Sequence, residues 1–263
     1  MKVCLILSTY NWKEALELCL RSLNQQTRMP DEVIIADDGS TEDTRQLIDS
    51  MRDGFRCPLI HVWQEDKGFR KSKILNEALR KCTSEYVIFI DGDIICDRHF
   101  VEDHCSIARR GFFVAGSRAN IKTEDAYRIG KCAELKISIF TRGVERWWNA
   151  VRIPFLFPLS KNSYRNKPFH GRGANMAMFM DDLKAINGFN EDIVGYGFED
   201  VELFSRLYNL GVKRNWAKWL CIEYHIKHKR KVVTKSNQKA FDKTLNSITG
   251  ENGIEHLKNK NND

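Results

Sequence analysis

Two aspartates separated by a single glycine follow one of the apolar runs of the chain. Asp91 and Asp93 come directly after residues 87–90, which are β-branched or aromatic and leave no polar face. This pattern predicts a strand buried on both faces of a parallel sheet, and open α/β sheets bind ligands at the carboxyl ends of such strands. Two carboxylates there suit a divalent metal that carries a phosphorylated substrate. An acidic surface turn is the alternative.

Polar residues also follow the two apolar runs at the start of the chain. Thr9 and Asn11 come after the first run, and Asp37 and Asp38 come after the second. If the three runs are parallel strands of one sheet, these side chains converge on one sheet edge. A nucleotide bound there would find in Asp37 or Asp38 an acceptor for a base N–H or for ribose hydroxyls. Asp38 could instead cap the following helix.

The apolar runs alternate with helical patterns along the first half of the chain. Four strands divided by helices predict βαβ units with right-handed crossovers. The fold class is therefore α/β, with a Rossmann-like, mainly parallel central sheet flanked by helices. The chain contains neither G-x-G-x-x-G nor G-x-x-x-x-G-K-[ST], which disfavours a dinucleotide site and a P-loop. The expected strands are residues 3–7, 32–36, 59–63 and 86–90.

The composition is that of a globular protein with one domain. The 263 residues are 42% hydrophobic and 29% charged, and no Pro/Gly/Ser-rich linker divides them. No apolar run approaches the roughly 18 residues of a membrane span, and the run at residues 3–7 is too short for a signal peptide. The eight cysteines form no C-x-x-C pair. They are interpreted as reduced thiols of a cytoplasmic protein, with neither a disulfide nor a zinc site.

In the second half, two adjacent acidic residues begin a predicted helix. Glu199 and Asp200 follow a glycine-rich loop at residues 195–197, and the helix carries an apolar stripe that anchors it in the core. A fixed helix start beside a flexible loop suits a catalytic carboxylate, although acidic residues favour this end of a helix without any catalytic role. The helix dipole should keep Asp200 ionised near neutral pH. Tyr196 could stack on a sugar face.

Four segments of the first 120 residues stand in a familiar order and spacing. They read LSTYNWKEALELCLRSLNQQT, DEVIIADDGSTEDT, QEDKGFRKSKILNEAL and YVIFIDGD. In these segments the chain resembles the nucleotide-sugar-binding half of family 2 glycosyltransferases of the GT-A fold. The resemblance implies that Asp37 or Asp38 contacts uracil and that Asp91 lies near the ribose. It also implies that Asp93 holds Mn²⁺ or Mg²⁺.

The third segment departs from the family pattern. The commoner Ala-Arg-Asn reads Ile74-Leu75-Asn76 in this chain, so the usual arginine is missing. The resemblance then leaves Arg70 and Lys73 as the basic residues that lie along the nucleotide.

Residues 170–211 resemble the carboxyl-terminal segment of β-1,4-galactosyltransferases and of bacterial polymerising transferases with a galactosyltransferase-type ending. This second resemblance implies that Asp200 is the general base and that Glu199 binds an acceptor hydroxyl. Gly173 falls in the same segment and is assigned to donor binding.

A histidine downstream of the catalytic acid is the usual third metal ligand in such enzymes. His225 and His228 both follow an apolar segment expected to return towards the site. We favour His225, which follows the apolar residues directly, over His228, which lies among basic residues. His170 is a weaker candidate, and a surface histidine without a ligand is the alternative for each.

Together the resemblances imply a metal-dependent, inverting glycosyltransferase that moves a hexose or N-acetylhexosamine from a UDP-sugar to a hydroxyl of a glycan or lipid-linked glycan. Such a reaction would serve a cell-surface polysaccharide, lipopolysaccharide or capsule. Residues 1–120 are assigned to nucleotide-sugar binding, 121–232 to the acceptor and the base, and 233–263 to a polar tail. A non-catalytic nucleotide-sugar or glycan-binding module is one alternative. A sugar nucleotidylyltransferase is another, but residues 8–12 lack the Gly/Arg-rich loop that it needs.

Basic and aromatic residues alternate between residues 142 and 172. This stretch has seven Lys/Arg against the single Glu145 and includes the adjacent Trp147 and Trp148. The mixture predicts a face that docks on anionic lipid at the inner side of the cell membrane. A solvated basic face over a core-packed segment is the alternative, and nucleic acid is disfavoured because no binding motif accompanies the charge.

Overall fold

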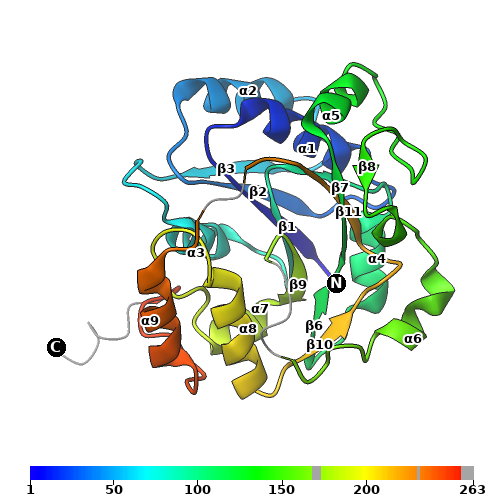
Figure 1. The fold of residues 1–263 in the computed structure, drawn as a ribbon. Coiled ribbons are helices and arrows are strands. Elements are labelled where there is room, and N and C mark those ends of the chain that lie inside the picture. Colours follow the sequence, from blue (N-terminus) through cyan, green and yellow to red (C-terminus); the bar gives the residue numbers. More distant parts are fainter. Residues whose placement is uncertain (168–172, 230–231, 256–263) are drawn as a thin grey trace.

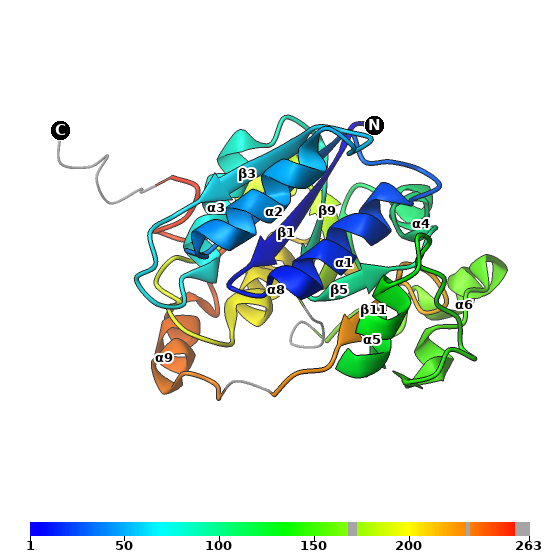
Figure 2. The same ribbon diagram turned by 90° about the horizontal axis from the view of Figure 1, so that it is seen from above.

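The computed structural model describes residues 1–167, 173–229 and 232–255. Their centre is a seven-stranded sheet with the strand order β10-β6-β9-β4-β1-β2-β3. Figure 1 and Figure 2 show helices on both faces of this sheet. The predicted α/β fold with a mainly parallel central sheet is confirmed.

Four parallel strands of the first half form one side of the large sheet. β1 pairs with β2 and β4, and β2 pairs with β3. The register places Thr9 opposite Asp37 and Ser8 opposite Asp91, so the polar residues meet at one sheet edge as predicted. The elements of this half are β1 (Val3–Thr9), α1 (Lys13–Asn24), β2 (Glu32–Asp37), α2 (Glu42–Arg52), β3 (Leu59–Trp63), α3 (Lys71–Lys81) and β4 (Tyr86–Asp91).

Strands from later in the chain extend the sheet beyond β4. β9 (Asn175–Phe179) lies between β4 and β6 (Phe112–Ala115) and is antiparallel to both. β10 (Lys213–Trp216) then pairs with β6 in parallel. The residue before β9 therefore sits at the same sheet edge as the end of β4, which brings the region around Gly173 to the predicted site.

A smaller sheet brings a distant strand to Asp93. β11 (Ile222–Ile226) pairs with β5 (Ile94–Cys96) and with β7 (Ser117–Ile121), and β8 (Val144–Glu145) completes this sheet. β5 begins directly after Asp93. Because His225 lies opposite Ile94 in the register, the end of β11 reaches the metal-binding aspartate predicted from the sequence.

Helices cover both faces of the large sheet with apolar side chains. α1, α2 and α4 (Phe100–Ile107) contribute to the core on one face, and Figure 2 shows α1 and α2 side by side there. α3, α7 (Met180–Ala185) and α8 (Glu199–Asn209) contribute to the core on the other face. The remaining elements before the last helix are α5 (Thr123–Gly130), the 3₁₀ turns η1 (Trp147–Asn149) and η2 (Pro154–Leu156), and α6 (Phe157–Ser160).

The described part of the expected polar tail packs onto the domain. α9 (Lys235–Thr244) lies beside α8 in Figure 1, and Phe241 on α9 is buried. Further along, the Ile254 side chain packs against the core that α3, α7 and α8 form. The sequence did not predict these contacts, because the segment is mostly polar and only a few of its apolar residues make them. Among the described helices, none is long and apolar enough to cross a membrane.

Candidate active site

A cavity of about 730 Å³ opens at the carboxyl ends of β1 and β4. Residues from both halves of the chain line it. The sequence-predicted residues that do so are Thr9, Asp38, Asp91, Asp93, Gly173, Glu199, Asp200, His225 and His228. Four others, Asn11, Asp37, Arg70 and Lys73, are not among the lining residues. His170 lies outside the described residues.

Asp93, His225 and His228 form a compact cluster on one side of the cavity. The Nε2 atoms of His225 and His228 lie 3.3 Å and 3.0 Å from Asp93 Oδ2. Burial raises the pKa of the Asp93 carboxyl, but the hydrogen bonds from the two histidines outweigh it and hold that pKa well below its usual value. The carboxylate is therefore ionised at neutral pH and can bind a cation.

The chemistry of this cluster fits a divalent metal. One ligand atom from each of its three residues lies within 4.8 Å of the others, and a carboxylate with two imidazoles is a common donor set for transition metals. Asp93 Oδ1 and His225 Nδ1 are buried and make no hydrogen bond to the described residues. Buried polar atoms are normally paired, so these two atoms indicate a ligand.

Asp91 is held by two donors rather than lying free at the strand end. Its Oδ1 atom accepts hydrogen bonds from Ser8 Oγ at 2.8 Å and from Lys71 Nζ at 2.5 Å. Lys71 Nζ also lies 3.9 Å from Glu199 Oε1. Burial lowers the pKa of Lys71, but the charges of Asp91 and Glu199 reverse this and raise the pKa well above its usual value. Lys71 thus links the donor-side strand to the start of α8.

Sequence reasoning missed Lys71, although the sequence contains a signal for it. Lys71 and Lys73 lie in the first turn of α3, which has no acidic residue. Positive charge is unfavourable at this end of a helix, and such a local conflict often marks a functional position. Only the structure distinguishes Lys71, which lines the cavity, from Lys73, which does not.

Asp200 is fixed at the first turn of α8 by backbone donors. Gly173 N donates to its Oδ2 atom and Val201 N donates to its Oδ1 atom, both at 2.8 Å. Burial raises the pKa of Asp200, while the Gly173 hydrogen bond and the charge of Lys71 act in the opposite direction. The prediction from the sequence considered only the helix dipole, whereas burial has the largest effect and raises the pKa of Asp200.

Glu199 is the neighbour of Asp200 and shares its environment. Its side chain is 13% exposed, and its Oε2 atom is buried without a hydrogen-bond partner among the described residues. Burial raises the pKa of Glu199, which Lys71 opposes. Two adjacent carboxyls with raised pKa values in a cavity are typical of proton-transfer sites.

The α8 helix is anchored by a buried ion pair as well as by apolar contacts. Arg206 Nη2 lies 2.6 Å from Glu202 Oε2, and neither side chain is exposed. Arg206 also donates to the Ile186 and Gly188 carbonyls of the turn after α7. These contacts hold the body of α8 in a fixed position.

The two adjacent aspartates at the end of β2 have different environments. Asp37 is 1% exposed, and its two oxygens accept hydrogen bonds from Ser40 N and His61 Nε2. Asp38 lines the cavity and accepts hydrogen bonds from Arg70 N and Gln64 Nε2. Asp38 does not cap α2, whose N-cap residue is Thr41. Of the two predicted nucleotide contacts, Asp38 is the one with access to a ligand.

The other predicted donor-side residues have structural contacts outside the cavity. Asn11 Oδ1 accepts a hydrogen bond from Thr41 N at 2.9 Å and so joins the loop after β1 to the start of α2. The Arg70 guanidinium donates to the Glu65 carbonyl, while its backbone N–H holds Asp38. Arg70 therefore supports the cavity wall through its backbone.

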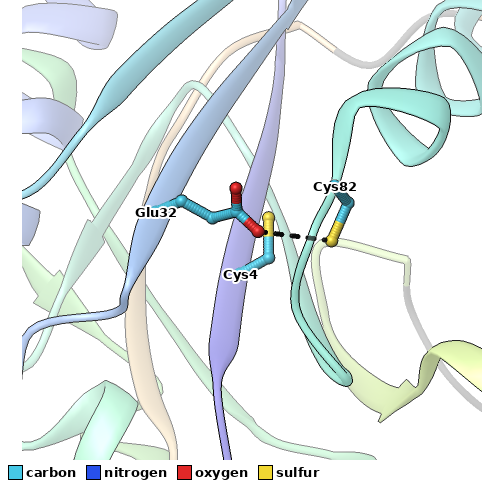
Figure 3. Close-up of side chains that lie close together, drawn as sticks. All are labelled: Cys4, Glu32 and Cys82. Carbon is cyan, nitrogen blue, oxygen red and sulfur yellow. Dashed lines mark hydrogen bonds between the residues drawn. The ribbon is translucent and has the colours of Figure 1, made fainter.

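A second cluster of ligand-type side chains lies at the opposite edge of the sheet. Figure 3 shows Cys4, Glu32 and Cys82 side by side. One ligand atom from each of them lies within 4.8 Å of the others. Glu32 Oε1 already accepts hydrogen bonds from Thr83 N, Thr83 Oγ1 and Ser84 Oγ. Burial raises the pKa of the Cys4 thiol, which disfavours the thiolate that a metal needs. This cluster ties the turn after α3 to β2.

The sheet is mainly parallel, and the cavity opens at the carboxyl ends of its strands. Residues 4–183 match the model of glycosyl transferase family 2, and the chain therefore belongs to this family. Residues 155–229 match a second model, described as the N-terminal domain of galactosyltransferase. Both resemblances noted in the sequence are thereby confirmed.

This chain matches only part of each curated relative. Validoxylamine A glucosyltransferase of Streptomyces hygroscopicus subsp. limoneus is 26% identical over 220 residues, covering 79% of this chain and 48% of the relative. Chondroitin synthase of Pasteurella multocida is 25% identical over 225 residues, covering 79% of this chain and 23% of the relative. The chain thus spans about half or less of the length of these relatives.

Solved structures share the fold at lower identity. A mannosyltransferase from Pyrobaculum calidifontis, solved with GDP-Man and Mn²⁺, is 20% identical with a TM-score of 0.61 over 87% of this chain and 58% of its own. TarS of S. aureus, solved with UDP-GlcNAc, is 17% identical with a TM-score of 0.58 over 88% of this chain and 60% of its own. These likenesses establish the GT-A fold of the chain.

Proposed function

We propose that the protein is a metal-dependent, inverting glycosyltransferase that moves a hexose or N-acetylhexosamine from a UDP-sugar to a hydroxyl of a glycan. The observation that carries this proposal is the shared cavity, which has the Asp93, His225 and His228 cluster on one side and Asp200 at the start of a rigid helix on the other. Residues 1–120 then hold the donor, and residues 121–232 supply the base and the acceptor site. The chondroitin synthase relative supports a polysaccharide product.

On the donor side, Asp93, His225 and His228 would hold Mn²⁺ or Mg²⁺. When bound, the metal would stabilise the negative charge of the UDP leaving group. Asp38 would accept a hydrogen bond from the uracil or the ribose, and Asp91, which also lines the cavity, would lie near the ribose. Lys71 fixes Asp91 and contributes positive charge near the leaving group.

On the acceptor side, Asp200 is the general base. An acceptor hydroxyl loses its proton to an oxygen of Asp200 while the hydroxyl oxygen attacks the anomeric carbon. The new C–O bond forms on the face opposite the bond to UDP, which breaks, so the anomeric configuration inverts. The raised pKa of Asp200 makes it a better proton acceptor than an exposed aspartate. Glu199 would bind an acceptor hydroxyl beside it.

We further propose that the enzyme works at the cytoplasmic face of the membrane in cell-surface polysaccharide synthesis, on a lipid-linked or free glycan. Large apolar side chains are exposed around η1 and α6, with Phe155 79% and Leu159 74% exposed and Trp147 and Trp148 each 53% exposed. Basic residues accompany them, and each contributes about 1 kcal/mol near an anionic surface. An apolar and cationic face of this kind complements anionic lipid.

Vesicle sedimentation tests this membrane assignment. The protein should bind vesicles that contain anionic phosphatidylglycerol, bind neutral phosphatidylcholine vesicles less, and lose binding as salt rises. The paired changes Trp147→Ser and Trp148→Ser should weaken binding to the anionic vesicles. Equal recovery with both vesicle types, or none with either, would contradict docking on anionic lipid and favour a basic acceptor groove.

A donor screen tests the reaction. UDP-glucose, UDP-galactose, UDP-N-acetylglucosamine and UDP-N-acetylgalactosamine are incubated with the protein and Mn²⁺ or Mg²⁺, and UDP release is measured. We expect one donor to be hydrolysed slowly without acceptor, and we expect EDTA to stop the release. Binding of UDP without release from any of these donors would instead support a non-catalytic binding module.

A further inference from the structure

A short segment before and within α9 holds the glycine-rich loop of the active site. We call residues 233–237 the strap. Asn237 Nδ2 donates to the Gly195 carbonyl at 3.3 Å and to the Gly197 carbonyl at 2.8 Å. The backbone N–H of Thr234 donates to the Tyr196 carbonyl at 2.9 Å. Three successive loop carbonyls are therefore bound by the strap, and Asn237 is only 1% exposed.

The backbone of the glycine-rich loop is left-handed at several residues. Gly195 and Gly197 have φ angles of 92° and 97°, and Phe198 has a φ angle of 76°. A Cβ at Gly195 would lie 2.3 Å from Thr234 Oγ1, so the Thr234 side chain packs against the loop and leaves no space for a side chain at Gly195. Glycine allows many other conformations, and a left-handed phenylalanine is strained, so the surrounding contacts must select this one.

The loop connects directly to both sides of the cavity. It ends at Phe198, which precedes Glu199 and Asp200, and Tyr196 and Gly197 line the cavity together with Val233 of the strap. On the donor side, Gly195 N donates to the Phe69 carbonyl at 2.9 Å. A displacement of the loop would therefore move Asp200 relative to the donor.

The strap lies beyond both family matches, which end at residues 183 and 229. We propose that the strap is a positioning element for the catalytic base, and that Asn237 is its main positioning residue because it fixes the loop that carries the start of α8. The proposal rests on the proposed function, since it assigns Asn237 to the orientation of Asp200. Asn237 itself does not line the cavity.

The change Asn237→Asp tests the side chain, because it keeps the shape and removes the Nδ2 donor. We expect turnover to fall about 10-fold to 100-fold, the loss that a displacement of about 1 Å causes, with UDP affinity measured by calorimetry within about twofold of the parental value. Gln238→Ala is the matched control. Gln238 is the next residue on α9, and its side chain donates to Asp242 at the surface, so Gln238→Ala should leave turnover unchanged.

A pair of changes at Thr234 tests the backbone bond separately. Thr234 has a φ angle of −73°, which proline adopts, so Thr234→Pro removes the N–H that holds Tyr196 without forcing a new φ. Thr234→Ala keeps that N–H. We expect Thr234→Pro to lower turnover like Asn237→Asp, and Thr234→Ala to retain it.

Hydrogen exchange at residues 195–201 reports on the strap independently of turnover. It should rise in Asn237→Asp and Thr234→Pro and stay parental in the two controls. Parental exchange or parental turnover in both test variants overturns the strap proposal. A fall in thermal stability and UDP affinity that matches the loss of turnover also overturns it, since Asn237 would then be only structural. Absence of UDP release by the parental protein would contradict the proposed function and leave the exchange result intact.

Discussion

The donor-side half and the base-side half of the cavity are built in different ways. On the donor side, Thr9, Asp38 and Asp91 lie at or just beyond the ends of adjacent parallel strands, so a single sheet edge gathers them. On the base side, Asp200 begins a helix and depends on Gly173 N, on Lys71 and on a loop that ends in the left-handed Phe198. The donor side is positioned by the register of a sheet, and the base side by long-range contacts.

This difference implies different sensitivity to substitution. Side chains at strand ends can be changed with little effect on the fold, because the strands behind them are buried and paired. Residues that fix the start of α8 support each other, so a change there affects both geometry and charge. The following changes test this contrast.

The largest effect is expected for Asp93→Ala on the donor side. The change removes the carboxylate of the cluster, so UDP release should fall to background at every Mn²⁺ concentration. Thermal stability should remain nearly parental because Asp93 lies beyond the end of β4. Asp181→Ala removes an exposed carboxylate that pairs with Arg110 and serves as the control. Near-parental turnover of Asp93→Ala would contradict the assignment of the metal site.

Asp200→Asn should follow in size. The amide can still accept the hydrogen bond from Gly173 N but accepts no proton from the acceptor, so turnover should fall by about two to four orders of magnitude. Steady-state kinetics should show this loss in kcat with a nearly unchanged KM for the donor. A raised donor KM with a parental kcat would place Asp200 in donor binding instead.

Lys71→Met should reduce turnover by roughly 10-fold, since it removes the charge-assisted hydrogen bond to Asp91, which contributes about 1.5 kcal/mol. The variant removes the positive charge that faces Asp91, Glu199 and Asp200, so the pKa of Asp200 rises further. The acid limb of the pH–rate profile should then move to higher pH. Lys71→Arg should restore most of the activity, and Lys73→Met on the same helix turn should change nothing. If the acid limb of Lys71→Met stayed at its parental pH, Lys71 would not influence the ionisation of the base.

The smallest effect is expected for Asp38→Asn. Replacing the carboxylate weakens one hydrogen bond to the nucleotide, so the donor KM should rise about 5-fold to 10-fold with kcat unchanged. Asp37→Asn is the matched comparison, because within the described structure the Asp37 carboxylate bonds only Ser40 N and His61. It should lower the melting temperature and leave the donor KM alone. A raised donor KM in Asp37→Asn with a parental donor KM in Asp38→Asn would show that Asp37, rather than Asp38, contacts the nucleotide.

The donor side could be predicted from the sequence because its information is local. Apolar runs of residues 3–7 and 87–90 mark buried strands, and the polar residues behind them must lie at one sheet edge. The start of α8 was also visible, since Glu199 and Asp200 precede an apolar stripe. Burial of these carboxyls was not, because it depends on how distant segments pack over them.

The remaining features depend on pairing between distant segments. The approach of His225 to Asp93 follows from the register of β11 with β5, which no local pattern specifies. The role of Asn237 was hidden because a polar residue in a polar stretch resembles a tail until its hydrogen bonds to Gly195 and Gly197 are known. Only the resemblance to the family paired His225 with the metal at Asp93, and nothing in the sequence pointed to the partners of Asn237.

Calorimetric titration of UDP in the presence of Mn²⁺ tests the division of roles most directly. We expect Asp200→Asn to bind UDP with parental affinity, because the base side contributes little to donor binding. We expect Asp93→Ala to lose the Mn²⁺-dependent part of the affinity while remaining folded. Loss of UDP affinity in Asp200→Asn together with parental Mn²⁺-dependent binding in Asp93→Ala would contradict the account.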